Sequence, residues 1–171
     1  KIMKGFSLIE LLIYFGILVT ILLLLTGFLW LIVLGNIKET SYQEVQQNGR
    51  FALWKITKEV KKATGINSPF EGNFASTLSL LMADTNLNPT VLDVFEGKLR
   101  ITQGTNPPQY LTTEKVIINN LQFTNLSYPG TPGTIRVKMI IDYSNLGTKI
   151  EYTASMDLKS SVSLVPGGAA P

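Results

Sequence analysis

The chain has 171 residues and a formal net charge of +3, a size that allows one modest domain in addition to an anchoring segment. It contains no cysteine, which excludes disulfides and thiolate chemistry, and no histidine, which removes the commonest general base and metal ligand. Lys58, Lys61 and Lys62 cluster around Glu59, as on a solvated helix face, and no basic run is long enough to indicate nucleic-acid binding.

A long apolar segment lies near the start of the chain. No charged residue occurs from Leu11 to Ile37, and a helix over Leu11–Leu34 would extend about 36 Å, enough to cross a hydrocarbon core of ~30 Å. The competing interpretation is a secretory signal peptide. Its apolar region is usually only ~7–15 residues long, and bulky residues at 30–34 stand here where its small-residue cleavage site would lie. The sequence therefore predicts a transmembrane helix.

The charges before this segment predict its orientation. Lys1 and Lys4 precede the apolar run, so the positive-inside rule places the N-terminus in the cytoplasm and everything after Ile37 outside it. Glu10 stands at the edge of the run, where a carboxylate is costly unless it finds a partner. It is either a functional residue or a helix-start acid at the headgroup level, favoured by the helix dipole.

The residues that lead into the apolar run resemble the prepilin processing motif of the type IV pilin family: Gly5, Phe6, Ser7, Leu8, Ile9 and Glu10. In that motif a basic leader ends in glycine, phenylalanine begins the mature chain, and glutamate is its fifth residue. The resemblance implies that residues 1–5 are a leader peptide and that a prepilin peptidase cuts between Gly5 and Phe6. It also implies that the new Phe6 amine is N-methylated. Glu10 would then meet the terminal amine of a neighbouring subunit and act as a selector of register during assembly.

An amphipathic pattern continues the helix beyond Gly35. Apolar residues recur on one face at helical spacing: Val45, Ala52, Ile56, Val60 and Ala63. Gly49 lies on the same face and would let another element approach closely, and Thr64-Gly65 predicts the helix stop. We expect one helix from about Phe6 to Ala63, about 87 Å long. Residues 6–37 form its transmembrane half and residues 38–64 its amphipathic half.

Within the amphipathic half, the stretch from Asn48 to Ala52 sharpens the resemblance. It is similar to the corresponding helix of minor pilins and pseudopilins of the PilW and pseudopilin J type, and the expected order of strands after it is similar too. This implies a minor subunit near the tip of a filament, which helps to initiate assembly. The alternative is the amphipathic helix of any pilin.

Residues 65–165 are expected to form a β-rich extracytoplasmic domain, followed by a flexible tail at 166–171. Apolar and polar residues alternate over 78–82, and the runs 91–95 and 98–102 flank Glu96-Gly97, a two-residue hairpin turn. Further strands are predicted at 115–119, continuing to Phe123, and as a pair over 134–143 and 149–158. The expected fold class is α+β and pilin-like, with one long N-terminal helix packed against a mainly antiparallel β-sheet.

The sequence offers little chemistry. It has no Ser-His or Cys-His pair and no phosphate-binding glycine loop, so we expect no catalytic residues and no cofactor. Asp84, Asn86 and Asn88 resemble the start of a calcium loop. However, Pro89 stands at the glycine position and Phe95 at that of the final glutamate. A polar turn is therefore the better interpretation of these three residues.

Together these features predict a structural subunit of a type IV pilus or a type II secretion-like pseudopilus. Its expected location is a single pass through the inner or cytoplasmic membrane, with the C-terminal domain outside the cytoplasm. Its expected partners are other pilins or pseudopilins, prepilin peptidase and membrane lipid, without nucleic acid. The alternative is a non-polymerising, membrane-anchored binding or adhesin domain, which predicts an uncut N-terminus. A membrane-tethered enzyme is disfavoured because histidine and cysteine are absent.

Overall fold

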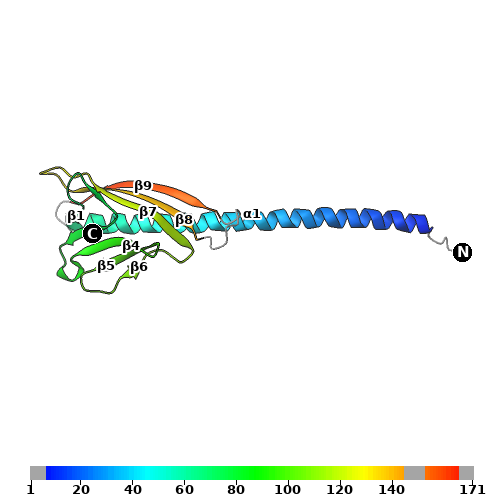
Figure 1. Cartoon of the computed structure of the whole chain (residues 1–171), viewed down its shortest axis with the longest axis horizontal. Helices are drawn as coiled ribbons and strands as arrows, with labels where there is room; N and C mark the ends of the chain where they lie inside the picture. The colour runs from blue at the N-terminus through cyan, green and yellow to red at the C-terminus, as the bar shows by residue number, and fades with distance from the viewer. Residues whose placement is uncertain (1–6, 145–152, 166–171) are drawn as a thin grey trace.

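The computed structural model describes residues 7–144 and 153–165. One helix, α1, runs without a break from Leu8 to Lys62, which for its 55 residues corresponds to about 83 Å. Its first half projects alone, and its second half lies among β-strands (Figure 1). The prediction of one long N-terminal helix followed by antiparallel β-structure is confirmed.

Five strands form the first antiparallel sheet, in the order β1-β3-β4-β5-β6. Their bounds are Ala63–Ser68 for β1, Leu78–Met82 for β3, Thr90–Phe95 for β4, Lys98–Gln103 for β5 and Gln109–Tyr110 for β6, with a short 3-10 helix, η1, at Thr85–Leu87. The predicted hairpin turn joins β4 to β5. Glu96 and Gly97 have φ angles of 50° and 73°, the left-handed pair that a type I′ turn requires.

Four strands form the second antiparallel sheet, in the order β2-β7-β8-β9. Their bounds are Phe74–Ala75 for β2, Val116–Asn125 for β7, Thr134–Tyr143 for β8 and Ser155–Ser163 for β9. The two sheets meet at the β4–β5 turn, where the backbone N–H of Ile118 donates to the carbonyl of Gly97 at 2.7 Å. The absence of a side chain on Gly97 keeps this contact close, because an added Cβ would lie 2.9 Å from Cγ2 of Ile117.

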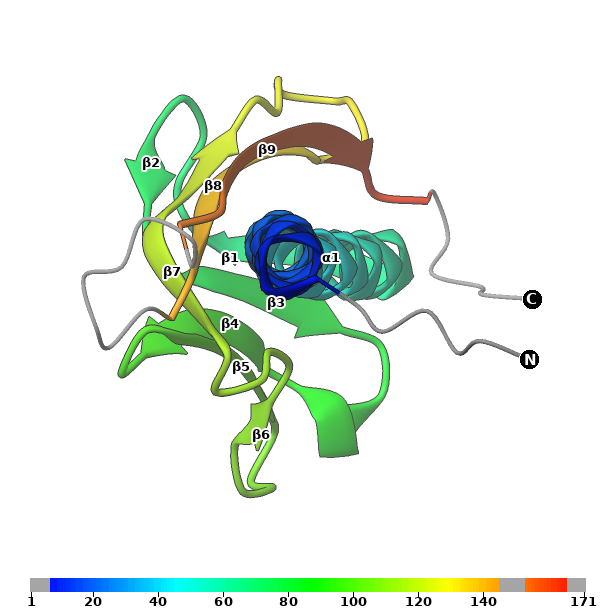
Figure 2. The ribbon, with the colours of Figure 1, turned by 90° about the vertical axis from the view of Figure 1, so that its right-hand side faces the viewer.

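The core lies between the two sheets and the second half of α1. Viewed along the helix, β8 and β9 lie on one side of α1 and β4 and β5 on the other, while one flank has no strand over it (Figure 2). The apolar face predicted for this half is confirmed, since Val45, Ala52, Ile56, Val60 and Ala63 are all fully buried. The sheets meet this face with Leu78, Leu80, Leu92, Phe123, Met139 and Ile141.

The end of the helix differs from the prediction. α1 ends at Lys62, and Thr64 and Gly65, the predicted stop, belong to β1. Ala63 already has extended backbone angles, φ −70° and ψ 145°, is fully buried, and pairs with Met82 of β3. Strand pairing and the burial of Ala63 therefore end the helix, and Gly65 is not used as a left-handed cap.

The sheets also differ in detail from the single sheet that the sequence predicts. The sequence predicts no strand at β1, β2 or β6, and the strands divide into two sheets. β9 continues beyond Leu158 to Ser163 because it follows β8 along its length, as far as the pair of Ser163 with Thr134. Outside the described residues lie the predicted leader 1–5, Phe6, the segment 145–152 and the predicted tail 166–171.

Candidate functional site

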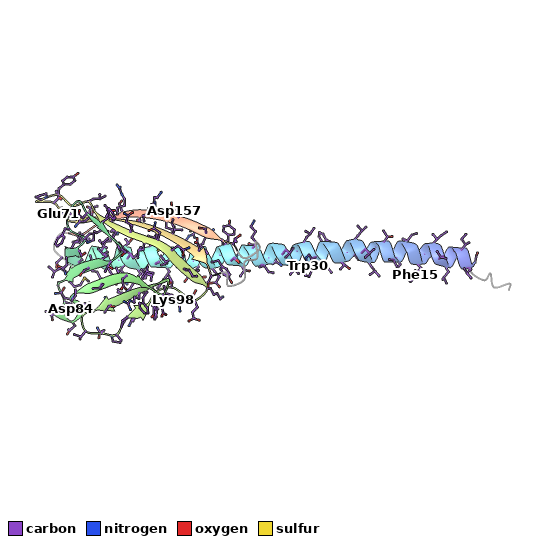
Figure 3. The ribbon with its side chains drawn as sticks, in the orientation of Figure 1. Phe15, Trp30, Glu71, Asp84, Lys98 and Asp157 are labelled. Carbon is purple, nitrogen blue, oxygen red and sulfur yellow. The ribbon has the colours of Figure 1, made fainter. Side chains whose placement is uncertain are left out.

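The first half of α1 has an apolar surface that is exposed all round the helix. Ser41 is the first residue of the helix that is buried. Before it, the large apolar side chains from Leu8 to Val33 are exposed on every side of the helix, by 37% to 80%. Phe15 and Trp30 illustrate this arrangement, since both project from the helix far from the sheets (Figure 3). A soluble monomer rarely carries so large a continuous apolar surface, so this half requires apolar surroundings.

The hydroxyl groups of the two threonines in this half are satisfied within the helix. The hydroxyl of Thr20 donates to the carbonyl of Gly16 at 2.9 Å, and that of Thr26 donates to Leu22 at 2.7 Å. Neither hydroxyl therefore needs a partner from the surroundings. α1 is long and apolar enough to span a membrane.

Glu10 lies in the first turn of α1. Ser7 is the N-cap residue, and its carbonyl accepts the backbone N–H of Glu10 at 3.1 Å and of Leu11 at 3.2 Å. The side chain of Glu10 is exposed among apolar neighbours, near the positive end of the helix dipole. This position fits both interpretations of Glu10. Gly5 and Phe6, the predicted cleavage and methylation positions, lie outside the described residues.

The stretch from Asn48 to Ala52 fixes the helix to β9 and to the loop before β7. The buried Asn48 donates through Nδ2 to the carbonyl of Glu44 at 2.9 Å, and its Oδ1 accepts the backbone N–H of Thr113 at 3.0 Å. Gly49 faces β9, where a Cβ would lie only 2.6 Å from Cδ1 of Leu158. The prediction that Gly49 permits close approach is confirmed, and Asn48 and Gly49 hold the domain in place.

Glu59 is a buried carboxylate, whereas the sequence predicts that it lies on a solvated helix face. Its side chain is 2% exposed, and it forms an ion pair with Nζ of Lys55 at 2.8 Å. Nε2 of Gln103 on β5 lies 3.4 Å from Oε2 of the same carboxylate. Helical spacing in the sequence could have indicated this burial. Glu59 follows Ala52 and Ile56 on the buried face, and Lys55 lies one turn before it.

Two surface ion pairs shift the pKa of their basic members. Arg100 on β5 donates from two nitrogens to Asp93 on β4, at 2.7 and 2.8 Å, and this hydrogen bond raises the pKa of Arg100. Lys115, just before β7, pairs with Glu44 of α1, and this hydrogen bond raises the pKa of Lys115. The second pair connects the start of β7 to α1.

The three calcium candidates lie around η1. Oδ1 of Asp84 accepts the backbone N–H of Asn86 at 2.9 Å, and Oδ1 of Asn88 accepts that of Met82 at 3.2 Å. Across the described ranges, no three acidic, histidine or cysteine side chains converge on a point where a metal ion could sit. These local hydrogen bonds favour the polar turn.

An open cleft of about 1120 Å³ lies between β1 and the loop before β8, with Phe70, Glu71 and Leu164 in its lining. Its polar groups hold the loops together. Asn125 donates through Nδ2 to the carbonyl of Pro69 at 2.8 Å and accepts the backbone N–H of Ser127 at 3.0 Å. The long helix is therefore the stronger candidate for the functional site.

No protein-family model, curated protein or solved structure matches the chain. Its function is therefore inferred from α1 and the residues that surround it.

Proposed function

We propose that this chain is a membrane-anchored filament subunit of the type IV pilin class, of the minor PilW or pseudopilin J type. Prepilin peptidase cuts it between Gly5 and Phe6, and it assembles through α1 into a pilus or pseudopilus. The observation that carries the proposal is that the two halves of one continuous helix have different surroundings. Its first half packs against nothing in the described chain, and its second half forms the core of a folded domain.

Two apolar environments can cover the first half of α1 in succession. Before assembly, lipid covers it, with Lys1 and Lys4 on the cytoplasmic side and the β-domain on the other. After assembly, the helices of neighbouring subunits replace the lipid. Because α1 is unbroken from Leu8 to Lys62, the domain and the anchor move as one rod, which suits a subunit that is drawn axially out of a membrane.

Glu10 selects the axial register between neighbouring subunits. Processing would leave a charged amine on Phe6, and a carboxylate one turn further along can reach the amine of an axially displaced neighbour. Each charge is costly among apolar side chains unless it is paired. The pair therefore forms only when two subunits are in register.

Incorporation of Glu10 variants tests this role. The full chain is produced with Glu10→Gln or Glu10→Ala, and the amount in sheared filaments is compared with the amount left in the membrane. We expect both variants to be processed and inserted but to fall in the filament fraction by at least about tenfold, the loss of roughly 1.4 kcal/mol of pairing. Glu39→Gln, an exposed acid on the same helix beyond the apolar run, is the matched control. Unchanged incorporation of Glu10→Gln into filaments would contradict the proposed role of Glu10 in assembly.

A further inference from the structure

The cleft between β1 and the loop before β8 lies at the end of the molecule that is far from the first half of α1. Glu71, which lines the cleft, stands at the opposite end from Phe15 (Figure 3). α1 ends at Lys62, 28 positions beyond Leu34, which corresponds to about 42 Å along the axis, and β1 follows directly. In a chain that is anchored by the first half of α1, the cleft therefore lies well away from the membrane.

One wall of the cleft is the outer edge of β1. Thr64, Gly65 and Ile66 all line it, although successive residues of a strand point to opposite faces of a sheet. A cleft that three consecutive residues line lies at the edge of their strand. In the described part of the chain β1 pairs with β3 only and is the last strand of its sheet, so this edge has no neighbouring strand. The main chain of β1 therefore presents peptide N–H and C=O groups to the cleft.

The polar side chains that line the cleft are already engaged within the protein. The hydroxyls of Thr64, Ser127 and Thr131 each form a hydrogen bond with a main-chain group, at 2.8 to 3.1 Å. Asn125 uses both ends of its amide to hold the loops. A ligand that is recognised by side-chain hydrogen bonds, such as a sugar, therefore finds few free groups among the described residues of this lining. The main chain of β1 remains, and it is the group that recognises an added strand.

The charge of the cleft indicates the chemistry of the ligand. Glu71 is exposed, and the described residues of the lining include no other charged side chain. An exposed carboxylate pairs with a basic side chain, and the planar guanidinium of arginine suits it best. Phe70, which is 76% exposed, and Val165, which is 42% exposed, add apolar surface to the same cleft. These features fit an extended peptide that carries a basic residue close to an apolar one.

We propose that the cleft binds an extended segment of another extracytoplasmic protein, which pairs with β1 as a sixth strand of the first sheet. Its main chain bonds to β1, a basic side chain meets Glu71, and an apolar side chain packs on Phe70 and Val165. Since β1 is six residues long, the segment that pairs with it spans roughly 20 Å. The inference takes from the proposed function only the topology, which places the partner outside the cytoplasm, and it does not depend on assembly into a filament.

Synthetic peptides test the site on the full chain in detergent micelles. One set of fluorescent octapeptides alternates valine and serine and carries a single arginine, which is moved through the eight positions. A second set carries glutamate in its place. We expect fluorescence polarisation to show that the best arginine peptide binds at least about fivefold more tightly than its glutamate counterpart. The net charge of +3 on the chain would by itself favour the glutamate set.

Methylation of the peptide nitrogens tests the pairing with β1. In a strand, alternate residues form hydrogen bonds with the same neighbouring strand. We therefore expect single N-methyl groups on the best arginine peptide to weaken its binding about tenfold at every second position and little at the positions between. A loss without this period of two, or no binding by any member of the arginine set, would overturn the inference.

Two charge reversals locate the bound peptide. Glu71→Lys should reverse the preference, so that the glutamate peptide binds more tightly than the arginine peptide. Asp157→Lys is the matched control, because it changes the net charge equally at an exposed acid of β9, away from Glu71 (Figure 3). It should keep the preference for arginine. The same preference in Glu71→Lys as in the unaltered chain would contradict the assigned site. These measurements need no filament, so their failure would leave the proposed function standing.

Discussion

Gly49 of α1 lies so close to Leu158 of β9 that a Cβ on the glycine would stand 2.6 Å from Cδ1 of the leucine. β9 is an edge strand of the four-stranded sheet, and its approach to the helix depends on this missing side chain. Asn48, the preceding residue, fixes the helix to the loop before β7 through Thr113. Adjacent residues of one motif therefore hold the long helix to two separate parts of the domain.

A larger side chain at position 49 should destabilise the domain. Gly49→Val must displace Leu158, and overpacking of this kind costs roughly 1–3 kcal/mol of unfolding free energy. Urea unfolding of the full chain in detergent micelles measures the loss. Gly35→Val is the matched control, because nothing lies within 4 Å of a Cβ built there. Equal losses in the two variants would show that the close approach at Gly49 does not matter.

The ion pair of the partly exposed Lys55 and the buried Glu59 should respond asymmetrically to mutation of its two members. Lys55→Met leaves a carboxylate that is 2% exposed without its cation, which should cost about 1–3 kcal/mol. Glu59→Gln should cost less, because Lys55 is 24% exposed and can turn to water while the new amide still reaches Gln103. The same urea titration compares the two variants. A larger loss of unfolding free energy for Glu59→Gln than for Lys55→Met would contradict the burial of the Glu59 carboxylate.

The pair of Lys115 and Glu44 makes a pH-dependent contribution to stability. The hydrogen bond to Glu44 raises the pKa of Lys115 above its ordinary value of 10.5. The contribution is therefore complete below pH 10.5 and is lost as the pH rises through the folded-state pKa. We expect the urea midpoints of the unaltered chain and of Lys115→Gln to differ at pH 8 and to converge in the alkaline range. A constant difference would mean that the charge of Lys115 contributes nothing.

Much of the architecture could be predicted because its signals are local. The apolar run and the recurrence of Val45, Ala52 and Ile56 indicate one continuous helix, and α1 confirms it. Glu96-Gly97 carries its own turn geometry, so the β4–β5 hairpin follows directly from the sequence.

The rest depends on pairing between distant residues. Ala63 leaves the helix because Met82 pairs with it, and β9 extends to Ser163 because β8 offers partners that far. The burial of Glu59 depends on Gln103 and on the sheet above it, so its charge alone gave the wrong environment. Tertiary contacts of this kind override local propensity and are not visible in a single sequence.

Mass spectrometry of the N-terminus, on the protein isolated from the membrane and filament fractions of the cells that make it, tests the central claim most directly. The account predicts a chain that begins at Phe6 with a methylated amine, since the pairing of that amine with Glu10 is the proposed basis of assembly. A mature protein in which residues 1–5 remain attached to Phe6 would contradict the pilin assignment and favour an anchored, non-polymerising binding domain.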